Sequence, residues 1–319
     1  MEQSSDVMIG AAAHGPEAAE GDEHPVIMGR FIHIADLHFW RVTRNPFRLL
    51  NKRFLGNLNV YFKRRHQFDT AVGASGAAAA AATGVKTALL TGDFTSTALR
   101  EEFEQARAFV DELRRQFETV ILPGNHDYYT FESFRRRRFE TYFGPYLPSG
   151  GYPTRVDTAA GAPMILAPTA CPNVVSSRGR ITAAEVTAVE ALLKETQGPA
   201  VVAGHYPVLH ETPGYSLTKG RRLRGAEALR QVMGAHCARG GGPLLYVCGH
   251  AHRFDFAADR AHPGLWHLCT GAFFHRNLRD GVTGEFAEVA IKRDRFEVFR
   301  HTLREDGWLR EGVTAGAAG

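Results

Sequence analysis

The sequence predicts an α/β fold in which helices pack against layers of strands. Short apolar runs alternate with amphipathic stretches along most of the 319 residues, a pattern typical of helices packed on a sheet. The apolar runs from Gly241 onward follow one another without a helical stretch between them, which predicts a second sheet that is mixed or antiparallel. No internal repeat or Pro/Ser-rich linker interrupts the body, so we expect one domain over residues 29–308.

The expected strands are short apolar runs, several of which end in polar residues. They are GRFIHIADLH at 29–38, VKTALLTGDF at 85–94, FETVILPGNHD at 117–127, PMILAPTA at 163–170, PAVVAGHYP at 199–207, GGPLLYVCGHAH at 241–252, GLWHLCTGAFF at 264–274, EFAEVAIK at 285–292 and RFEVFRHTL at 295–303. Residues 101–117 predict a helix because their apolar side chains recur on one helical face. Residues 182–198 predict another, which opens on a capping box of Thr182 and Glu185. The Ala-rich residues 71–90 predict a helix that leads into a strand.

Composition limits the class of protein. Hydrophobic residues make up 44% of the chain, enough for a core, and no apolar run reaches the length of a membrane-spanning helix. Residues 1–28 are rich in Ala, Gly and acidic residues and lack the basic and apolar parts of a secretory signal, so we expect a disordered tail. Residues 309–319 are expected to form a flexible C-terminal tail. The four Cys show no CxxC spacing, and with no signal this predicts a cytoplasmic protein.

Metal-binding residue types gather where several of the expected strands end. They are Asp36, His38, Asp93, Asn125, His126, Asp127, His205, His250 and His252, and a Gly directly precedes four of them, namely Asp93, Asn125, His205 and His250. In open α/β sheets the carboxyl ends of strands form the ligand crevice, so these side chains are expected to converge there. The pairs Asp36/His38 and His250/His252 would point the same way if their backbone is extended. Each motif alone is common, but five in one chain, each at a strand end, predict a metal site.

The ordered series DLH, GD, GNHD, GHYP and GHAH resembles the calcineurin-like metallophosphoesterase superfamily, over about residues 31–274. The resemblance implies a four-layer αββα sandwich of two β-sheets flanked by helices, and a hydrolytic site with two divalent metal ions. It implies that Asp36, His38 and His252 hold the first ion, that Asn125, His205 and His250 hold the second, and that Asp93 bridges the two.

The chemistry expected of such a site is hydrolysis of a phosphoric ester by attack of a metal-bound hydroxide. Carboxylate, imidazole and amide ligands suit Mn²⁺ or Fe, which we favour, and Zn²⁺. His126 would face the substrate and stabilise or protonate the leaving oxygen, and Asp127 would hydrogen-bond His126 and orient it. The non-enzyme alternative is an inactive scaffold, as some superfamily members are. The presence of His126, His205, His250 and His252 favours an active enzyme.

A basic and apolar insertion at about 39–68 separates the first two motifs, and from His38 to Phe68 it holds eight Arg and Lys and no acidic residue. Asn45 and Pro46 predict a helix start, and Gly56 with its neighbouring Asn residues predicts an interruption, giving a helix–turn–helix flap. The apolar stripe at helical spacing consists of Phe47, Leu50, Phe54, Leu55, Leu58 and Phe62. Two interpretations stay open: the stripe packs on the body, or it enters a lipid surface while cations meet anionic headgroups.

Basic residues on both sides of the first motifs suggest a rim around the crevice. The candidate rim residues are Arg44, Arg48, Lys52, Arg53, Arg135 and Arg136. A basic rim also suits nucleic acid, but the apolar content exceeds what binding to a phosphate backbone requires, so nucleic acid is the less favoured partner. A peripheral position on the inner face of a membrane is the favoured alternative to a purely cytoplasmic one.

The insertion suggests which phosphoester the site would accept. Its place between the first two motifs is similar to that in enzymes that cleave the pyrophosphate of UDP-2,3-diacylglucosamine in lipid A synthesis, so the favoured substrate is lipid-linked. The stretch GDFTSTALREEF resembles 3′,5′-cyclic nucleotide phosphodiesterases instead, and a nuclease is a third alternative. The choice among monoester, diester and pyrophosphate, and the oligomeric state, stay open.

Overall fold

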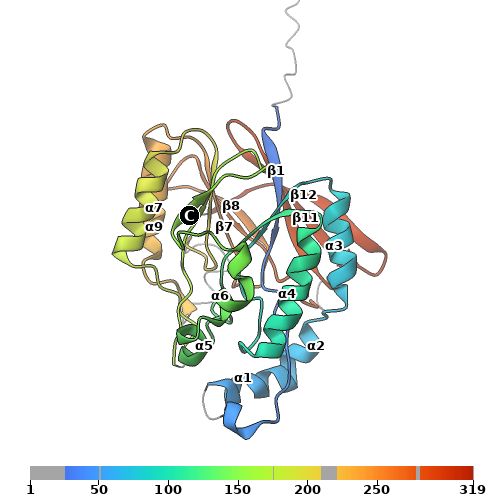
Figure 1. Cartoon of the computed structure of the whole chain (residues 1–319). Coiled ribbons are helices and arrows are strands. Elements are labelled where there is room, and N and C mark those ends of the chain that lie inside the picture. The colour runs from blue at the N-terminus through green and yellow to red at the C-terminus, as the bar shows by residue number, and fades with distance from the viewer. Residues whose placement is uncertain (1–25, 50–51, 175, 210–220, 278–280, 319) are drawn as a thin grey trace, which may run out of the picture.

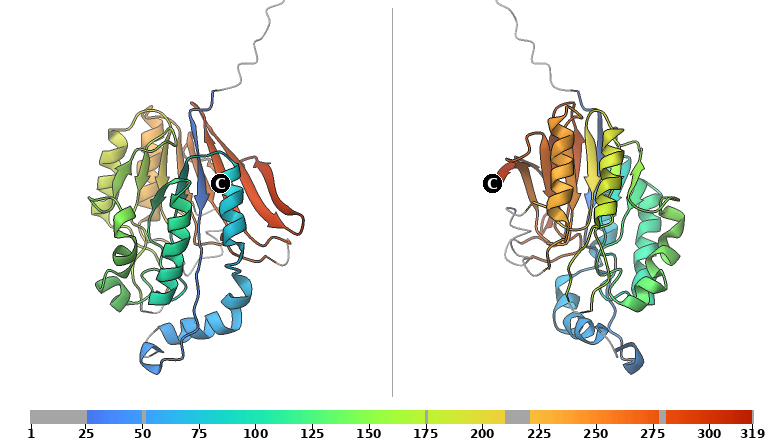
Figure 2. Two further views of the ribbon diagram at one scale, coloured as in Figure 1. Left: turned by 45° about the vertical axis from the view of Figure 1, so that its right-hand side comes forward. Right: turned by 90° about the vertical axis from the view of Figure 1, so that its left-hand side faces the viewer.

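The computed structural model describes residues 26–49, 52–174, 176–209, 221–277 and 281–318. Two β-sheets lie face to face, with helices covering the outer face of each (Figures 1 and 2). This arrangement confirms the predicted four-layer α/β sandwich. The expected tail at 1–28 falls outside the described residues except for its last three. Of those three, Met28 already donates a backbone hydrogen bond to Ile291.

The first sheet combines the earliest and the latest strands of the chain. Its order is β12 (Gly307–Val313), β11 (Phe296–Arg304), β10 (Glu285–Ile291), β1 (Gly29–Ile34), β2 (Thr87–Leu90) and β3 (Glu118–Ile121). Strands β1, β2 and β3 are parallel, whereas β10 runs antiparallel to β1. The late strands therefore extend the first sheet, where the sequence had predicted that they belong to a second one.

The second sheet holds the middle of the chain together with its last strand. Its order is β13 (Gly316–Ala318), β8 (Asp255–Asp259), β9 (Leu265–Cys269), β7 (Leu244–Cys248), β6 (Ala200–Ala203), β5 (Met164–Leu166) and β4 (Thr154–Val156). Strands β5, β6, β7 and β9 are parallel, β4 is antiparallel to β5, and β8 is antiparallel to β9 but parallel to β13. Both sheets are thus mixed: the parallel strands form one side of the first sheet, with β3 at its edge, and the middle of the second.

Alternate side chains of the central strands pack into different layers. Phe31 of β1 packs between the sheets with Leu166 and Val201 of the second sheet, while its neighbour Ile32 packs under the helices of the first. The helices of the first sheet are α3 (Val72–Ala82) and α4 (Arg100–Arg114), and those of the second are α7 (Ala183–Lys194) and α9 (Ala226–Ala238). Shorter helices α5 (Phe131–Arg135), α6 (Arg138–Phe143) and η3 (Gly144–Tyr146) follow β3. No described helix is long and apolar enough to cross a bilayer.

The capping box predicted for residues 182–198 is confirmed, because the Thr182 hydroxyl accepts a hydrogen bond from the backbone of Glu185 at 3.3 Å. Helix α4 buries most of its predicted apolar face. Helix α9 was not predicted from the sequence. It begins after Gly225, which has a φ of 88° and offers no side chain to cap the helix, so its start carries no Ser, Thr, Asn or Asp signal.

Residues 53–67 of the insertion form one continuous helical rod at the lower end of the molecule in Figure 1. A short 3₁₀ turn, η1 (Pro46–Leu49), is capped by the Asn45 side chain, as predicted. Then α1 (Arg53–Asn59), a π-helical segment η2 (Val60–Arg64) and α2 (Arg65–Gln67) follow without a break. The predicted interruption at Gly56 is wrong. Gly56 stays helical and lies against Tyr129, whose hydroxyl would be 2.5 Å from an added Cβ, so Gly lets this helix approach the body.

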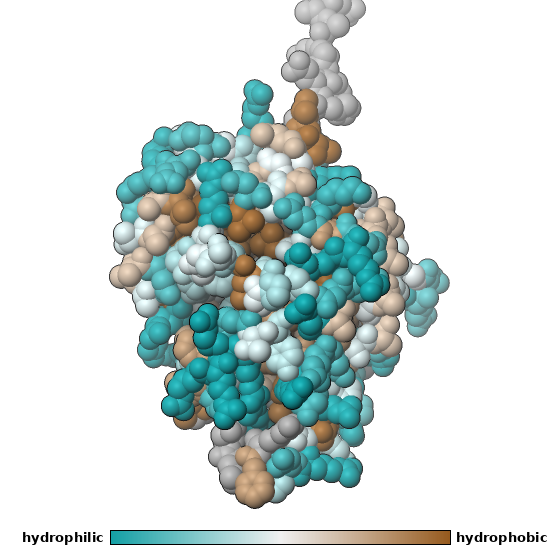
Figure 3. All heavy atoms as spheres, in the orientation of Figure 1, coloured by the Kyte–Doolittle hydropathy of each residue, from teal (hydrophilic) through white to brown (hydrophobic). Residues whose placement is uncertain are grey.

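The apolar stripe of the insertion faces solvent. The exposed fractions are 81% for Phe47, 50% for Phe54, 63% for Leu55, 39% for Leu58 and 68% for Phe62, and Leu50 lies outside the described residues. The interpretation in which this stripe packs on the body is therefore wrong for these five. In Figure 3 most of the visible face is hydrophilic, and a brown-tinted group projects at the lower end where Figure 1 draws the insertion.

The predicted flexible tail at 309–319 is wrong, because β12 and β13 continue the fold to Ala318. Strand β12 pairs with β11 at the edge of the first sheet, and most of its residues are exposed. An exposed edge strand needs no alternation of apolar and polar residues, so its sequence resembles a polar tail. The Arg310 guanidinium of β12 donates to the Glu288 carboxylate of β10 at 2.8 Å across the intervening strand.

Replacing Glu288 with Gln is expected to lower the free energy of unfolding at pH 7 by about 2 kcal/mol, since Arg30, Arg310 and the buried His301 lose the carboxylate that they share. Burial alone would raise the pKa of Glu288, but hydrogen bonds from His301 and Arg310 hold it at about 2. Because the folded pKa lies below the unfolded one, this contribution is complete above roughly pH 5 and is lost as pH falls toward 2.

Urea denaturation of the wild type and Glu288→Gln at pH 7 and pH 3 measures the difference, which should shrink at the lower pH. Glu311→Gln, at an exposed position of β12, is the matched control and should change little. Equal losses in the two variants would contradict a special role for Glu288.

Candidate metal centre

The predicted ligands follow the carboxyl ends of parallel strands in both sheets. Strand β1 leads to Asp36 and His38, β2 to Asp93, β3 to Asn125, β6 to His205, and β7 to His250 and His252. The two sheets lie face to face, so these loops meet at one end of the sandwich. The structure thus brings all seven predicted ligands together, and their binding of metal stays a prediction.

The backbone at these ligands is left-handed, which corrects the expectation of extended i, i+2 pairs. The φ angles are 54° at Asp36, 51° at His38, 56° at Asp93, 67° at His250 and 53° at His252, five of the seven described non-Gly residues with positive φ. Such conformations are costly and concentrate at functional sites, where surrounding contacts hold them.

Two glycines let the β2 and β3 loops touch. Gly92 has a φ of 93°, and a Cβ there would lie 2.3 Å from the Gly124 nitrogen. A Cβ on Gly124 would lie 2.2 Å from the Asp93 carboxylate. The two loops therefore approach as closely as backbone allows, which brings Asp93 and Asn125 to one centre.

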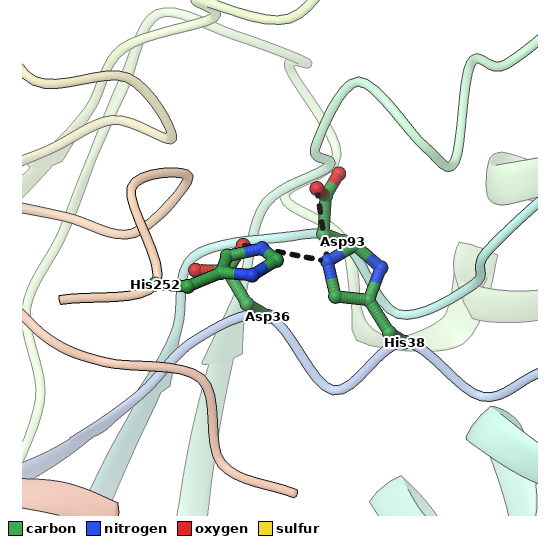
Figure 4. Close-up of side chains that lie close together, drawn as sticks. All are labelled: Asp36, His38, Asp93 and His252. Carbon is green, nitrogen blue, oxygen red and sulfur yellow. Dashed lines mark hydrogen bonds and ion pairs between the residues drawn. The ribbon is translucent and has the colours of Figure 1, made fainter. Parts of the chain in front are cut away.

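The first group of candidate ligands consists of Asp36, His38, Asp93 and His252, with their ligand atoms within 4.8 Å of one another (Figure 4). His38 Nε2 lies 2.9 Å from His252 Nε2 and 3.6 Å from Asp93 Oδ2. Asp36 Oδ1 lies 3.9 Å from His252 Nε2. Four ligand atoms from three separate loops thus face one small volume.

The second group consists of Asp93, His205 and His250. Asp93 Oδ1 lies 3.4 Å from His205 Nε2, and Asn125 Oδ1 lies 3.2 Å from the same nitrogen. Asp93 is the member common to both groups, and it turns one oxygen to each of them. This is the geometry expected of a bridging carboxylate.

Backbone carbonyls orient two of the imidazoles. His38 Nδ1 donates to the Thr95 carbonyl at 3.2 Å, and His205 Nδ1 donates to the Thr91 carbonyl at 2.7 Å. With Nδ1 carrying the proton, Nε2 of each ring is the atom that faces the centre. Such contacts fix both the tautomer and the ring orientation of metal-binding histidines.

The donor set fits divalent cations. Asp36 Oδ1 and His250 Nε2 are buried, and no described residue gives either atom a hydrogen-bond partner. Burial holds the pKa values of His250 and His252 well below the ordinary value, so both rings are neutral and able to donate a lone pair. Buried acceptors without partners are costly, and a bound cation would satisfy them.

The two carboxylates of the centre differ in charge preference. Burial raises the pKa of Asp36 to about 8. Burial would also raise the pKa of Asp93, but the charge of His205 holds it well below its usual range. Burial opposes a charge on His205, yet Asp93 raises the pKa of that ring to about 9. A cation at this centre would therefore displace protons from Asp36 and His205.

The model of the calcineurin-like phosphoesterase family matches residues 29–254. The chain belongs to this family. Members of the calcineurin-like phosphoesterase family are typically metal-dependent phosphoester hydrolases with a binuclear divalent metal centre, and the two groups of ligands that share Asp93 agree with such a centre.

A purple acid phosphatase of low sequence identity shows the same fold. Purple acid phosphatase PPD1 from yellow lupin (Lupinus luteus) seeds aligns with a TM-score of 0.58 and 10% identity, over 91% of this chain and 54% of that one. The 5′-nucleotidase of Candida albicans aligns with a TM-score of 0.48 and 13% identity, over 87% of this chain and 52% of that one. This calcineurin-like chain spans about half the length of each. No curated protein sequence matches it.

His126 lies beside the centre but belongs to neither ligand group. Its Nδ1 donates to the Ser96 carbonyl at 2.6 Å, and its ring stacks on Tyr129 with centroids 5.3 Å apart. Burial and the nearby Arg64 lower the pKa of His126 to about 3, so the ring is neutral and its Nε2 carries a lone pair. Its predicted role toward the substrate stays a prediction.

The Asp127 carboxylate binds backbone groups and not the His126 ring, which corrects the expected hydrogen bond between the two side chains. The Asp127 carboxylate is buried and accepts from the backbone N–H groups of Phe94, Thr95 and Gly124 at 2.8–3.3 Å. Burial, with the charge of Asp93, raises the pKa of Asp127 to about 7. The Ser96 carbonyl orients His126 instead, and Asp127 ties together the loops that carry Asp93 and Asn125.

The predicted rim residues divide into different environments. Arg53 is buried and donates to the carbonyls of Thr97 and Ala98 and to Glu132, so it holds the insertion to the body and is not a rim residue. Lys52 donates to the Ser176 carbonyl and lies 4.7 Å from the ring centroid of Tyr129, next to His126. The other candidates are exposed at Arg44, Arg135 and Arg136, and the Arg48 side chain lies outside the described part.

Arg64 is the functional candidate that the sequence did not single out. It stands in the run Lys63–Arg64–Arg65, and the stretch gives no signal that its middle residue turns inward. Its Nη2 lies 2.9 Å from His126 Nε2, and its Nη1 lies 2.9 Å from His38 Nδ1.

Two cavities adjoin the centre. One, of about 440 Å³, is bordered by His126, Arg64, Lys52, Phe54 and Leu55 among others. The other, of about 560 Å³, is bordered by residues that include His252, Arg253, His275, Asn277 and Arg300. The ring of His38 lies 4.8 Å from the rings of both His126 and His252, so the candidate centre separates the two cavities.

Proposed function

We propose that this protein is a two-metal phosphoesterase that hydrolyses a phosphodiester or pyrophosphate with an apolar substituent, a lipid-linked substrate at a membrane surface such as UDP-2,3-diacylglucosamine. The observation that carries the proposal is the composition of the cavity beside His126. Arg64 and Lys52 make it basic next to the centre, while the half-exposed Phe54 and Leu55 make it apolar toward the outside. An amphiphilic cavity of this kind suits a phosphate that carries an acyl group.

The second cavity favours a substrate with groups on both sides of the phosphorus. A diester or pyrophosphate carries a substituent on each side of the bond that breaks, whereas a monoester carries one. The cavity beside His252 is lined mainly by polar and charged side chains, including Arg253, Asn277 and Glu285, and would take the more polar substituent.

Divalent ions held by the seven ligands would acidify a water molecule and bind phosphate oxygens. The chain's own groups have complementary tasks. Asp93 fixes both ligand groups through its two oxygens, and the Ser96 carbonyl holds the His126 ring at the border of the cavity, where Nε2 lies 2.9 Å from Arg64 Nη2. From that position Nε2 could hold a proton for the departing oxygen.

The insertion supports a lipid surface as the place of action. Its apolar side chains are exposed, and the stretch from His38 to Phe68 has eight cationic residues and no acidic one. Aromatic and aliphatic side chains next to Lys and Arg are typical of interfacial helices on anionic membranes.

A substrate panel tests the proposal. UDP-2,3-diacylglucosamine, cyclic AMP, single-stranded DNA and the chromogenic bis-p-nitrophenyl phosphate should be compared at saturating Mn²⁺. We expect the highest kcat/KM for the lipid. A higher value for cyclic AMP or DNA would reject the lipid-linked substrate while leaving the phosphoesterase activity in place.

Replacing Phe47, Leu58 and Phe62 together with Ser is expected to spare hydrolysis of bis-p-nitrophenyl phosphate. Hydrolysis of the lipid in vesicles should fall by about tenfold or more, since loss of apolar side chains from a membrane interface weakens binding. All three are exposed and none borders the two cavities. Flotation with phosphatidylglycerol vesicles measures binding directly.

Leu309→Ser is the matched control, because Leu309 is 43% exposed but lies on β12, away from the insertion. It should leave flotation and both activities unchanged. If the triple variant lost both activities equally, the stripe would be part of the fold and not a docking surface.

A further inference from the structure

The strongest feature outside the expected metal site is the inward turn of Arg64 from the insertion helix. Val60 and Arg64 bound the π-helical segment η2, and Val60 is fully buried while Tyr61 and Phe62 between them are exposed. The same helical turn thus exposes Tyr61 and Phe62 to solvent and, at its end, directs the Arg64 guanidinium toward the candidate metal centre. π-Helical turns are rare and recur at functional sites, where the wider turn redirects a side chain.

Contacts on both sides keep this segment in place. Phe68, just after α2, is buried, and its ring lies 4.8 Å from the ring of His38 and 5.9 Å from the Arg64 guanidinium. At the other end, Gly56 lies against Tyr129, and Arg53 is bonded to the backbone at Thr97 and Ala98. The position of Arg64 is therefore set by the packing of the whole rod.

The Arg64 guanidinium faces imidazoles where a carboxylate would be expected. His38 Nδ1 already donates to Thr95, so Arg64 Nη1 at 2.9 Å gains no acceptor there. Among the described residues, no carboxylate forms an ion pair with Arg64. Burial lowers the pKa of Arg64, and the largest opposing influence is the charge of Asp93. Nearby Arg138, in contrast, is paired with Glu132 at 2.6 Å.

A partly buried cation next to a centre for two further cations is unfavourable unless an anion lies between them. We propose that Arg64 is a catalytic residue of this protein, whose guanidinium binds a non-bridging phosphate oxygen of the substrate beside His38 and His126. The inference rests on the phosphoesterase activity proposed above and not on the lipid nature of the substrate. A guanidinium donates two parallel hydrogen bonds to phosphate, and these strengthen as charge develops in the transition state.

Arg64→Gln tests this role against Arg65→Gln, its neighbour in the same helix, which is exposed and bonded to His66. With bis-p-nitrophenyl phosphate we expect kcat/KM to fall by roughly 10²–10³-fold in Arg64→Gln and to stay near wild type in Arg65→Gln. Arg64→Lys should restore part of the loss. Metal content, measured by plasma mass spectrometry, should be the same in all variants, since Arg64 is no ligand.

Inorganic phosphate gives a second readout that does not depend on turnover. Its dissociation constant, measured by calorimetry, should rise at least about tenfold in Arg64→Gln and stay unchanged in Arg65→Gln. Values within threefold of wild type for both kcat/KM and phosphate binding would overturn the role. So would loss of metal in a folded Arg64→Gln variant, because Arg64 would then support the ligands.

If Arg64→Gln fails to fold, the phosphate titration is repeated with Arg64→Lys and Arg65→Lys, which both keep the positive charge. Weaker phosphate binding by Arg64→Lys than by Arg65→Lys would then support the role of Arg64. Equal phosphate affinity in those two would overturn the inference. A wild type that binds phosphate through Arg64 but hydrolyses no phosphoester would reject the proposed function and leave the phosphate site standing.

Discussion

Replacing Asp93 with Asn is expected to abolish hydrolysis of bis-p-nitrophenyl phosphate and to remove both metal ions. Asp93 belongs to both groups of candidate ligands, and its oxygens lie 3.6 Å from His38 Nε2 and 3.4 Å from His205 Nε2. An amide supplies one neutral oxygen in place of two charged ones, so it cannot bridge two cations. We expect the loss in kcat/KM to exceed about 10⁴-fold, which corresponds to more than about 5 kcal/mol.

Metal content by plasma mass spectrometry gives the sharper measurement. The wild type should hold two ions per chain and Asp93→Asn fewer than one. His252→Ala alters only the first group, so it should retain the second ion. Asp111→Asn, a surface change in an ion pair with Arg107, should keep both. Two ions per chain in a folded Asp93→Asn protein would contradict the bridging role.

The sequence predicted which side chains would converge, because the candidate ligands follow strand ends. Apolar strand patterns located β1, β2, β3, β6 and β7, and the polar residues after them had to meet at one end of the parallel strands. The left-handed backbone at Asp36 and His250 could not be inferred from the pattern. It depends on contacts between loops, such as the hydrogen bond from the His250 backbone to the Asp36 carboxylate at 2.8 Å.

Roles that depend on side-chain direction were harder to predict. Asp127 follows His126 in the chain, but it turns toward the backbone of Phe94 and Thr95. Arg64 stands between two exposed cations, and only the π turn anchored by Val60 directs it inward. The directions of the Asp127 and Arg64 side chains depend on tertiary contacts, which leave no regular spacing of residue types in the sequence.

The fold was predictable where burial of one face gives apolar residues a regular spacing. It was less predictable in exposed elements at the edge of the fold. The edge strand β12 is mostly exposed, and helix α9 starts at Gly225 without a capping side chain. In the insertion, the spacing of Phe54, Leu58 and Phe62 correctly predicted one helical face, but spacing alone could not decide whether that face meets the body or the solvent.

Replacing His126 with Ala is expected to lower kcat by about 10²–10⁴-fold while both metal ions stay bound. The backbone N–H of residue 126 donates to Asp93 Oδ1 at 2.7 Å, and this bond survives the substitution. The lost group is the imidazole whose Nδ1 is fixed by the Ser96 carbonyl and whose Nε2 lies beside Arg64 at the border of the cavity. Because His126 belongs to neither ligand group, the substitution should affect the rate and not the metal content. His66→Ala, an exposed histidine of α2, should change neither quantity.

Asp127→Asn separates the two ways in which Asp127 could act. Its carboxylate binds three backbone N–H groups of the ligand loops, so the amide should lower the free energy of unfolding by roughly 1–3 kcal/mol and weaken metal binding. With excess Mn²⁺ the variant should recover much of its kcat, whereas His126→Ala should not. A low kcat in Asp127→Asn with full metal content and unchanged stability would instead show that the carboxylate acts through His126. The pair of variants thus distinguishes an Asp–His couple from the arrangement found here, in which a backbone carbonyl orients the histidine and the carboxylate holds the loops.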